Sequence, residues 1–363
     1  MIGYWLIAYW WVFLIESLVV AGVMGILALN ADKLVGREPK SLAGLKASML
    51  VTAVATFIAY LAVILGVYQV LGGGMQAQAL IVFAAMLSAV ILGVQWLLGP
   101  YIINAAYRTR PPQTRAELMA EALLQRLARK SGVKPPKLRI VDSRMPNAFA
   151  YSSSLAGSYV AVTSGLLRIA EPGELEAVLG HELGHLKHRD VSWILALSII
   201  PVMIYFLGRS LLYAGLLSGG GRDRENSGPY LLLIGIALIA ASVVFNFIIN
   251  HFNRLREYYA DAHSAIVTRR PRELQRALAK IYLSVKKDPI IAEETRSSSL
   301  AAPLFIVAPL VMFNGGFLVD IDYVVESLKS EPVNPLEELF STHPPIPKRL
   351  RFLDRLAARG LHE

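Results

Sequence analysis

The pentapeptide His181-Glu182-Leu183-Gly184-His185 carries the residue types that a hydrolytic metal centre needs. On a helix, two histidines at positions i and i+4 share one face, about 5–6 Å apart, so both imidazoles can bind one zinc ion. Glu182 stands beside the first histidine without being a ligand. Its carboxylate can take a proton from a water activated by the metal and deliver it to the leaving amine. The pentapeptide therefore predicts zinc-dependent cleavage of peptide bonds, with Glu182 as general base.

A zinc ion of this kind needs a third protein ligand and an open position. Glu257 and Asp261 are again four residues apart on a predicted helix. Glu257 can bind the metal, and Asp261 can hold a ligand histidine in the correct tautomer through a hydrogen bond. Two acids at this spacing, taken alone, also fit a solvated helix face, but the histidine pair favours the metal site. The sequence thus predicts one Zn²⁺ per chain, bound by His181, His185 and Glu257.

The histidine pair needs a helix with a buried opposite face. Residues 174–189 predict one, with acidic residues in the first turn and basic residues in the last, as the helix dipole prefers. Upstream, residues 114–129 show an amphipathic helical pattern. Two short strands are predicted at 138–141 and 159–163, separated by a turn of small residues at 152–157. These elements together predict a folded α+β module.

Composition predicts a membrane protein. Apolar residues make up 55% of the 363 residues and charged residues 17%, against about 25% charged residues in soluble domains. A helix that crosses the hydrocarbon core needs about 20 apolar residues. Five stretches meet this length, and Glu16 inside the first is a functional candidate by its location. The predicted spans are residues 4–29, 48–71, 76–98, 191–217 and 230–249.

Charge sets the predicted orientation. The net charge of +9 is spread in short clusters beside the apolar runs, which fits the flanks of membrane spans and predicts no nucleic-acid binding. The basic loop 31–46 and the arginines at 108–115 are expected in the cytoplasm, with the N-terminus outside. Cysteine is absent, which excludes disulfides, thiolate zinc sites and cysteine nucleophiles.

The expected fold is an α-helical membrane protein, multi-pass in the cell membrane, with a cytosolic α+β zincin-like metallopeptidase domain. Residues 1–100 form three N-terminal transmembrane helices, and 191–250 form two more. Residues 101–190 and 251–363 supply the two parts of the peptidase domain. The apolar run 300–319 is predicted not to cross, because a crossing would carry the basic C-terminal cluster outside.

Three separated motifs resemble the HtpX-type membrane proteases, gluzincins related to the CaaX prenyl endopeptidases. They are the 181–185 pentapeptide, the Glu257-x-x-x-Asp261 pair and His343-Pro344-Pro345, and the resemblance runs from about residue 117 to 353. It implies a zinc endopeptidase for quality control that cleaves misfolded or damaged membrane proteins. The expected partners are such polypeptides and the lipid bilayer. Proteins of this type have two spans before the peptidase module, whereas three are predicted here.

The same resemblance implies three further roles. Asn147-Ala148-Phe149-Ala150 is similar to the family's edge-strand motif, in which the asparagine contacts the substrate backbone. His343 and Arg349 resemble a histidine and an arginine that steady the oxyanion of the tetrahedral intermediate. A loop asparagine after Pro146 would fit Asn147 equally well, and a basic surface tail is the alternative for His343 and Arg349.

Other functions fit less of the sequence. A CaaX-type prenyl-protein endopeptidase is the alternative enzyme, although those relatives have more spans, which enclose a chamber. A scaffold with an inactive protease fold would not need both histidines, Glu182 and Glu257, all of which are present. A transporter would place its polar site at mid-membrane, whereas these residues lie outside the predicted spans.

Overall fold

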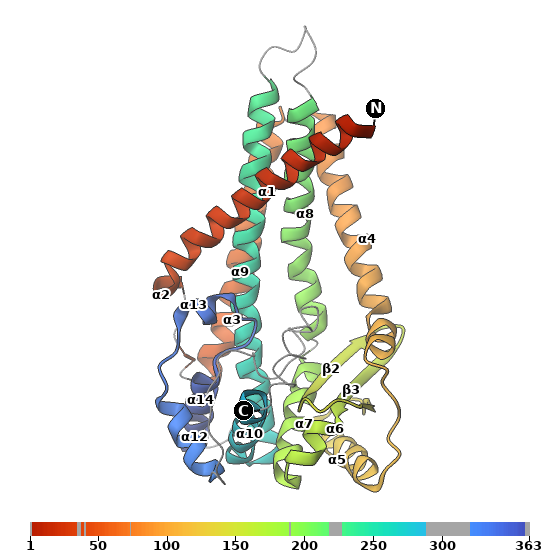
Figure 1. The fold of residues 1–363 in the computed structure, drawn as a ribbon, viewed down its shortest axis with the longest axis vertical. Helices are drawn as coiled ribbons and strands as arrows, with labels where there is room; N and C mark the ends of the chain where they lie inside the picture. The colour runs from red at the N-terminus through yellow and green to blue at the C-terminus, as the bar shows by residue number, and fades with distance from the viewer. Residues whose placement is uncertain are drawn as a thin grey trace. The chain divides into compact units, whose positions relative to one another are not determined.

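The computed structural model describes the chain in two compact units and covers residues 2–34, 38–39, 41–72, 74–188, 190–217, 227–287 and 320–359 (Figure 1). The first, here the helical unit, contains Met1–Val35, Val51–Gly93 and Ile194–His251. The second, here the sheet unit, contains Gly36–Leu50, Val94–Trp193 and Phe252–Glu363. The apolar run 300–319 lies outside the described residues, and its prediction stays a prediction.

Long apolar helices build the helical unit. Four of the fully described helices are long and apolar enough to cross a membrane, in agreement with the second to fifth predicted spans. The first predicted span falls in α1 (Ile2–Leu29), whose described apolar part, Ser17–Leu29, is shorter. The side chain of Glu16 lies outside the described part. The remaining long helices are α3 (Leu42–Val70), α4 (Met75–Ala106), α8 (Asp190–Leu217) and α9 (Ser227–Thr268), and the short α2 (Ala31–Leu34) follows α1.

Helices α8 and α9 pack backbone to backbone within the helical unit. A Cβ atom on Gly235 would lie 2.7 Å from the carbonyl oxygen of Gly208, and one on Gly215 would lie 2.8 Å from that of Gly228. Small residues allow such close approach between membrane helices, where van der Waals packing replaces the hydrophobic effect as the driving force. Met203 of α8, a fully buried side chain, belongs to a hydrophobic cluster formed by α3, α4, α8 and α9.

The sheet unit contains a mixed sheet of three strands in the order β1-β3-β2. Strand β1 (Lys137–Val141) runs parallel to β3 (Gly157–Thr163), and β2 (Ala148–Ser153) runs antiparallel to β3. The predictions of strands at 138–141 and 159–163 are confirmed. The predicted turn at 152–157 is too long, because β2 continues to Ser153, paired with Gly157.

Strand β2 was not expected from residue periodicity, because small residues hide its alternation. Its two aromatic side chains, Phe149 and Tyr151, are buried, and Tyr151 stacks on Tyr159 with ring centroids 5.2 Å apart. Such cross-strand aromatic pairs stabilise a sheet. The strand is therefore stabilised by its pairing with β3, which its own residue pattern does not reveal.

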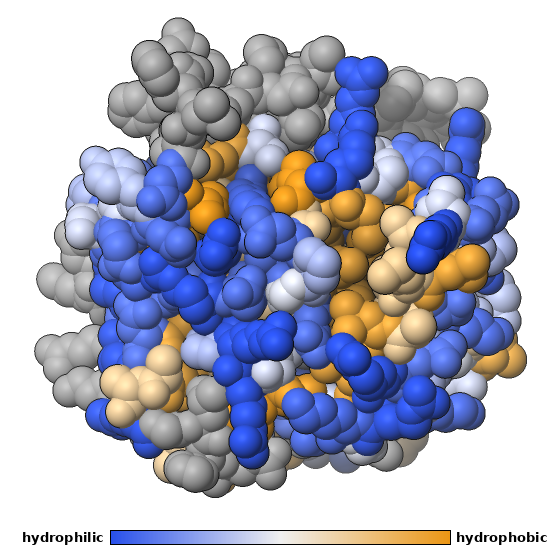
Figure 2. Space-filling view, turned by 90° about the horizontal axis from the view of Figure 1, so that it is seen from below, coloured by the Kyte–Doolittle hydropathy of each residue, from blue (hydrophilic) through white to orange (hydrophobic). Residues whose placement is uncertain are grey.

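Helices cover the sheet. α5 (Arg115–Ser131) begins with a capping box between Thr114 and Glu117, and it confirms the amphipathic helix predicted at 114–129. α7 (Pro172–Lys187) confirms the helix predicted at 174–189 and lies against β2. From the end where α5, α7 and α10 lie, the surface is mostly hydrophilic, with one broad hydrophobic area and smaller ones beside it (Figure 2). The other helices are α6 (Ser164–Ile169), α10 (Pro271–Lys287), α12 (Ile321–Ser330), α13 (Pro335–Phe340) and α14 (Ile346–Ala358).

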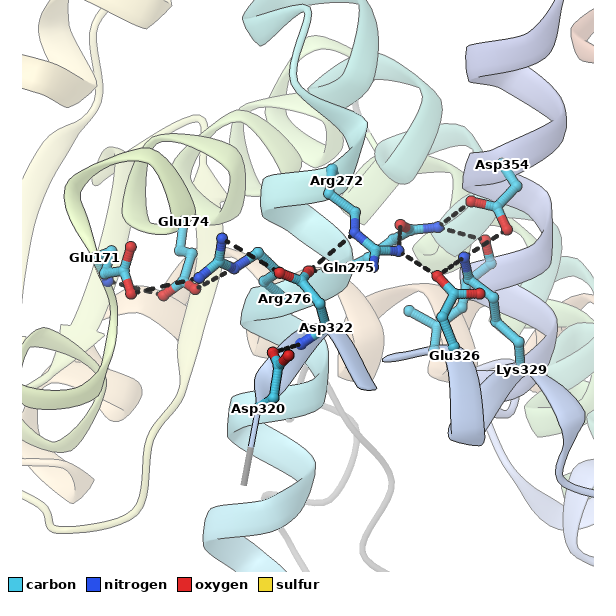
Figure 3. A network of polar contacts seen from close by, with 11 residues as sticks. Glu171, Glu174, Arg272, Gln275, Arg276, Asp320, Asp322, Glu326, Lys329 and Asp354 are labelled. Carbon is cyan, nitrogen blue, oxygen red and sulfur yellow. Dashed lines mark hydrogen bonds and ion pairs between the residues drawn. The ribbon is translucent and has the colours of Figure 1, made fainter. Parts of the chain in front are cut away.

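A network of charged side chains joins four helices of the sheet unit, α7, α10, α12 and α14 (Figure 3). Its most buried member is Glu174 of α7, which is fully shielded from solvent. The Glu174 carboxylate lies 2.7 Å from Lys280 Nζ and 3.5 Å from Arg276 Nε, and it accepts the backbone N–H of Glu171. This carboxylate therefore ties the start of the histidine-bearing helix to α10.

We expect Glu174→Gln to lower stability by about 1–3 kcal/mol, because it removes the buried carboxylate of Glu174 and leaves the partly buried Lys280 with only the more exposed Glu171 as its counter-charge. Glu176→Gln is the matched control on the same helix, since the Arg126 and Arg270 side chains that Glu176 meets are 66% and 60% exposed. Exposed pairs contribute about 0–1 kcal/mol. Thermal unfolding of both variants in detergent measures the difference, and equal midpoints would contradict the role given to Glu174.

Candidate metal centre

Helix α7 presents both histidines of the pentapeptide at one place. The rings of His181 and His185 lie edge to face with centroids 4.8 Å apart, and their Nε2 atoms are 3.2 Å apart. His181 is buried and His185 half-buried. On the opposite side of the helix, Leu179 and Leu183 are buried in the core. The helix thus directs two imidazole nitrogens toward a single point.

Helix α9 brings the predicted third ligand to the same point. Glu257 Oε2 lies 3.6 Å from His181 Nε2, and Glu257 Oε1 lies 3.4 Å from His185 Nε2. One ligand atom from each of the three residues lies within 4.8 Å of the others. The Glu257 side chain is buried, so its carboxylate faces the histidines and not solvent.

The three donors fit a zinc ion. Tetrahedral bonds of about 2.0–2.1 Å place neighbouring ligand atoms about 3.3–3.4 Å apart. The two histidine nitrogens are 3.2 Å apart, and each lies near a different oxygen of Glu257, at 3.6 Å for His181 and 3.4 Å for His185. The electrostatics agree. Burial lowers the pKa of His181, but its contacts with Asp261 and Glu257 outweigh this effect and raise the pKa to about 9. The buried carboxylates of Asp261 and Glu257 therefore favour a positive charge at this position, as the ligands of a metal cation do.

The ligands meet because the backbones of α7 and α9 almost touch. A Cβ atom on Gly184 would lie 3.0 Å from Ala260 Cα and 3.1 Å from His263 Cβ. One turn earlier, a Cβ atom on Gly180 would lie 3.2 Å from Ser264 Oγ. Two glycines four residues apart therefore form the face of α7 that contacts α9. Each of them directly precedes one of the two histidines. Sequence reasoning missed this role, although small residues at i and i+4 are a readable sign of close helix packing.

Asp261 holds the first histidine from behind. Its Oδ1 lies 2.9 Å from His181 Nδ1, so the nitrogen that faces away from Glu257 has a carboxylate partner. Asp261 lies one turn after Glu257 on α9, and its side chain is fully buried. This is the arrangement expected from the spacing of the two acids, in which the acid fixes the tautomer and ring orientation of a ligand histidine.

Arg349 of α14 braces Asp261. Its Nε donates to Asp261 Oδ2 at 2.9 Å and its Nη2 donates to Asp261 Oδ1 at 2.6 Å, a bidentate pair. Its Nη1 lies 3.8 Å from Glu257 Oε2. The side chain is fully buried behind the ligands. Two of its nitrogens thus bind Asp261, and the expected contact of Arg349 with an oxyanion stays a prediction.

His343 lies on the ligand side of the cluster. It follows α13 and precedes α14, and its Nδ1 is 3.1 Å from Glu257 Oε2. Its backbone N–H donates to Ser341 Oγ, which shapes the connection between the two helices. The structure therefore brings His343 beside Glu257, and its expected contact with an oxyanion stays a prediction.

Glu182 lies between α7 and the sheet. Its side chain is buried, and the backbone N–H of Ala150 in β2 donates to it. Burial raises the pKa of this carboxyl group, whereas positive charge on His181 and His185 lowers it. A carboxylate with a raised pKa is a better proton acceptor near neutral pH, which is the property that a general base requires.

Asn147 marks the start of β2, the strand that contacts Glu182. Its backbone N–H donates to Thr163 Oγ1 at 2.9 Å, and its carbonyl accepts from the Thr163 N–H at 3.0 Å. The residue is buried. These bonds fix the backbone at the beginning of the edge strand, three residues before Ala150.

The cluster, the strand beside it and the apolar helices define a class, the membrane-embedded metalloproteases. The chain belongs to peptidase family M48, whose profile matches residues 112–357. It is 55% identical over 286 residues to a protease HtpX homolog of Aeropyrum pernix, covering 79% of this chain and 89% of that protein. A protease HtpX homolog of Thermoplasma acidophilum is 38% identical over 318 residues, covering 86% and 97%.

Among solved structures, the crystal structure of S. mikatae Ste24p matches with a TM-score of 0.48 and 17% identity, covering 87% of this chain and 68% of that one. The family and the relatives confirm the resemblance stated from the motifs. They show that the chain is a multi-pass membrane metalloprotease, a hydrolase whose family implies a metal and polypeptide substrates.

We expect Gly184→Ala to weaken metal binding, because the new methyl group meets the backbone of Ala260 and must separate the two ligand-bearing helices. Overpacking of this kind costs about 1–3 kcal/mol. Gly173→Ala is the matched control in α7, since its methyl group meets the flexible end of the Glu273 side chain. Zinc affinity measured by competition with a chelator compares the two. Unchanged affinity in Gly184→Ala would contradict the proposed constraint.

Proposed function

We propose that His181, His185 and Glu257 bind one zinc ion and that the enzyme cleaves misfolded or damaged membrane proteins. The observation that carries the proposal is the buried cluster in which the three ligand atoms lie within 4.8 Å of one another. Zinc held there would supply an acidified water as nucleophile and would polarise the scissile carbonyl. The family and its relatives support the protease activity.

The chain's own residues divide the remaining chemistry. Glu182 accepts the proton of the attacking water and later delivers it to the leaving amine, and its burial keeps that proton from bulk solvent. The His343 ring lies beside Glu257 and can donate to the oxyanion that develops on the substrate. Strand β2 follows Asn147 and contacts Glu182 through Ala150, and as an edge strand it can align an extended substrate that Asn147 would contact.

Two substitutions separate the base from the ligand. We expect Glu182→Gln to abolish turnover while zinc stays bound, because Glu182 lies beside the ligands and is not one of them. Glu257→Ala should lose both zinc and turnover. Elemental analysis of the purified proteins measures zinc per chain, and cleavage of an unfolded membrane protein in detergent measures turnover.

Wild-type protein with and without a chelator provides the control for metal dependence. Full activity in Glu182→Gln would end the proposed mechanism. Zinc bound by Glu257→Ala as tightly as by wild type would show that the third ligand lies elsewhere.

Arg349 and Asp261 form a positioning pair in this proposal. We expect Asp261→Asn and Arg349→Lys each to lower zinc affinity or activity by about 10–100-fold, since both loosen the partner of His181. Zinc affinity separates this role from the one implied by resemblance. Loss of an oxyanion donor lowers kcat and leaves zinc affinity unchanged, whereas loss of a positioning residue weakens zinc binding itself.

We further propose that the metal centre faces the cytoplasm. The basic residues in loop 31–46 and at 108–115 support this orientation through the positive-inside rule. The chain has no cysteine, so single introduced cysteines report topology cleanly. Ala358→Cys on α14 should be shielded from an impermeant thiol reagent in intact cells, whereas Met75→Cys, at a position 84% exposed, should react. Labelling of Ala358→Cys from outside would reverse the orientation.

A further inference from the structure

The sheet unit contains a cavity lined by residues that follow His185 on α7 and Glu257 on α9. Its volume is about 220 Å³, and its walls come from the start of α3, the end of α7 and the later turns of α9. The side chains that give it its character are Lys46, Lys187, His188, Tyr259 and His263. None of the eight described residues that line it is acidic. The cavity is therefore a basic pocket with an aromatic wall, which suits an anion.

Local contacts hold these groups in place. Lys46 Nζ lies 5.7 Å above the centroid of the Tyr259 ring, a cation–π contact that directs the ammonium group toward the pocket wall. The His188 ring packs edge-on against the same tyrosine, with centroids 4.1 Å apart. One aromatic side chain thus positions a cationic residue from α3 and a histidine at the end of α7.

The start of α3 adds a further favourable field. Leu42, the first residue of this 29-residue helix, lines the cavity, and Ser41 Oγ accepts the N–H of Gly44. The first turn of a long helix carries partial positive charge and free N–H groups, which attract anions. The partial positive charge of this helix end and the charges of the two lysines all favour an anion in the cavity.

The sequence places both lysines where the chain enters the bilayer. Lys46 stands in the first turns of the span candidate Leu42–Gln69, and Lys187 closely precedes the span candidate Ile194–Leu216. Lysines at such positions extend their charged ends to the headgroup layer. The volume of the cavity is several times the space that one water molecule occupies, which is about 30 Å³. It accommodates a polar headgroup.

We propose that this basic cavity binds the phosphate headgroup of an anionic lipid. The site is separate from the metal ligands and does not require the proposed peptidase mechanism. Two of the helices that line it, α7 and α9, also carry His185 and Glu257. A bound headgroup would therefore bridge α3 to both ligand-bearing helices and stabilise the sheet unit.

Lipid binding to the full chain in neutral detergent tests the proposal. Native mass spectrometry and thermal unfolding are followed during titration with phosphatidylglycerol, with neutral phosphatidylcholine, and with inorganic phosphate. The variant Lys46→Gln/Lys187→Gln removes two charges from the cavity. Its matched control, Lys134→Gln/Lys137→Gln, removes two exposed lysines elsewhere, one of which also lies over a tyrosine ring, 5.8 Å from the Tyr159 centroid.

We expect phosphatidylglycerol to bind wild type and to raise its unfolding temperature, because a ligand that binds the native state stabilises it. The Lys46→Gln/Lys187→Gln variant should bind roughly thirtyfold more weakly, at about 1 kcal/mol for each lysine near an anionic surface. The control variant should bind as wild type does. Lys46→Arg/Lys187→Arg, which keeps the charge, should retain binding and guards against a folding defect.

Two results would overturn the proposal. Equal affinity of the Lys46→Gln/Lys187→Gln and control variants for phosphatidylglycerol would show that the cavity is not the lipid site. Phosphatidylglycerol binding no tighter than inorganic phosphate, or no tighter than phosphatidylcholine, would show that an anionic lipid is not the ligand.

Discussion

The closeness of α7 and α9 at Gly180 and Gly184 is the constraint on which the metal centre depends. Ala260 and Ser264 of α9 lie against the two glycines, so no side chain of α7 separates the two backbones there. Only at this spacing can Glu257 reach both imidazole nitrogens, at 3.6 and 3.4 Å. The hydrogen bond from Ser264 Oγ to the Ala177 carbonyl, 2.5 Å long, crosses the same interface. Van der Waals contact and one hydrogen bond thus set the distance between the two helices, and this distance fixes where the proposed metal ligands lie.

Charge is arranged in layers around this contact. The histidine nitrogens and Glu257 form the inner layer, Asp261 stands behind His181, and Arg349 stands behind Asp261. Each buried charge meets an opposite charge, which offsets the free energy of removing it from water. On the other side of the histidine-bearing helix, Glu182 receives the backbone N–H of Ala150, so the same strand that can align a substrate also orients the base.

Much of the site could be predicted because its chemistry is local. His181 and His185 are one helical turn apart, and so are Glu257 and Asp261, so each pair is visible in the sequence. The apolar runs of four membrane helices are longer than those of ordinary core helices. Non-local features were harder. Strand β2 pairs with the nearby β3, but its small residues hide the alternation that predicts a strand, and the place of Arg349 depends on a partner 88 residues away. No periodicity encodes either relation.

The separation of Arg349 from Asp261 along the chain also has a consequence for biogenesis. The sheet unit is assembled from three stretches of sequence, and the last of them carries His343 and Arg349 near the C-terminal end. The ribosome releases the histidine pair long before this last stretch. Glu257 and Asp261 also lie in that last stretch. The cluster can therefore close only when residues of both stretches have left the ribosome, and Arg349 can brace it only 88 residues after Asp261 has been synthesised.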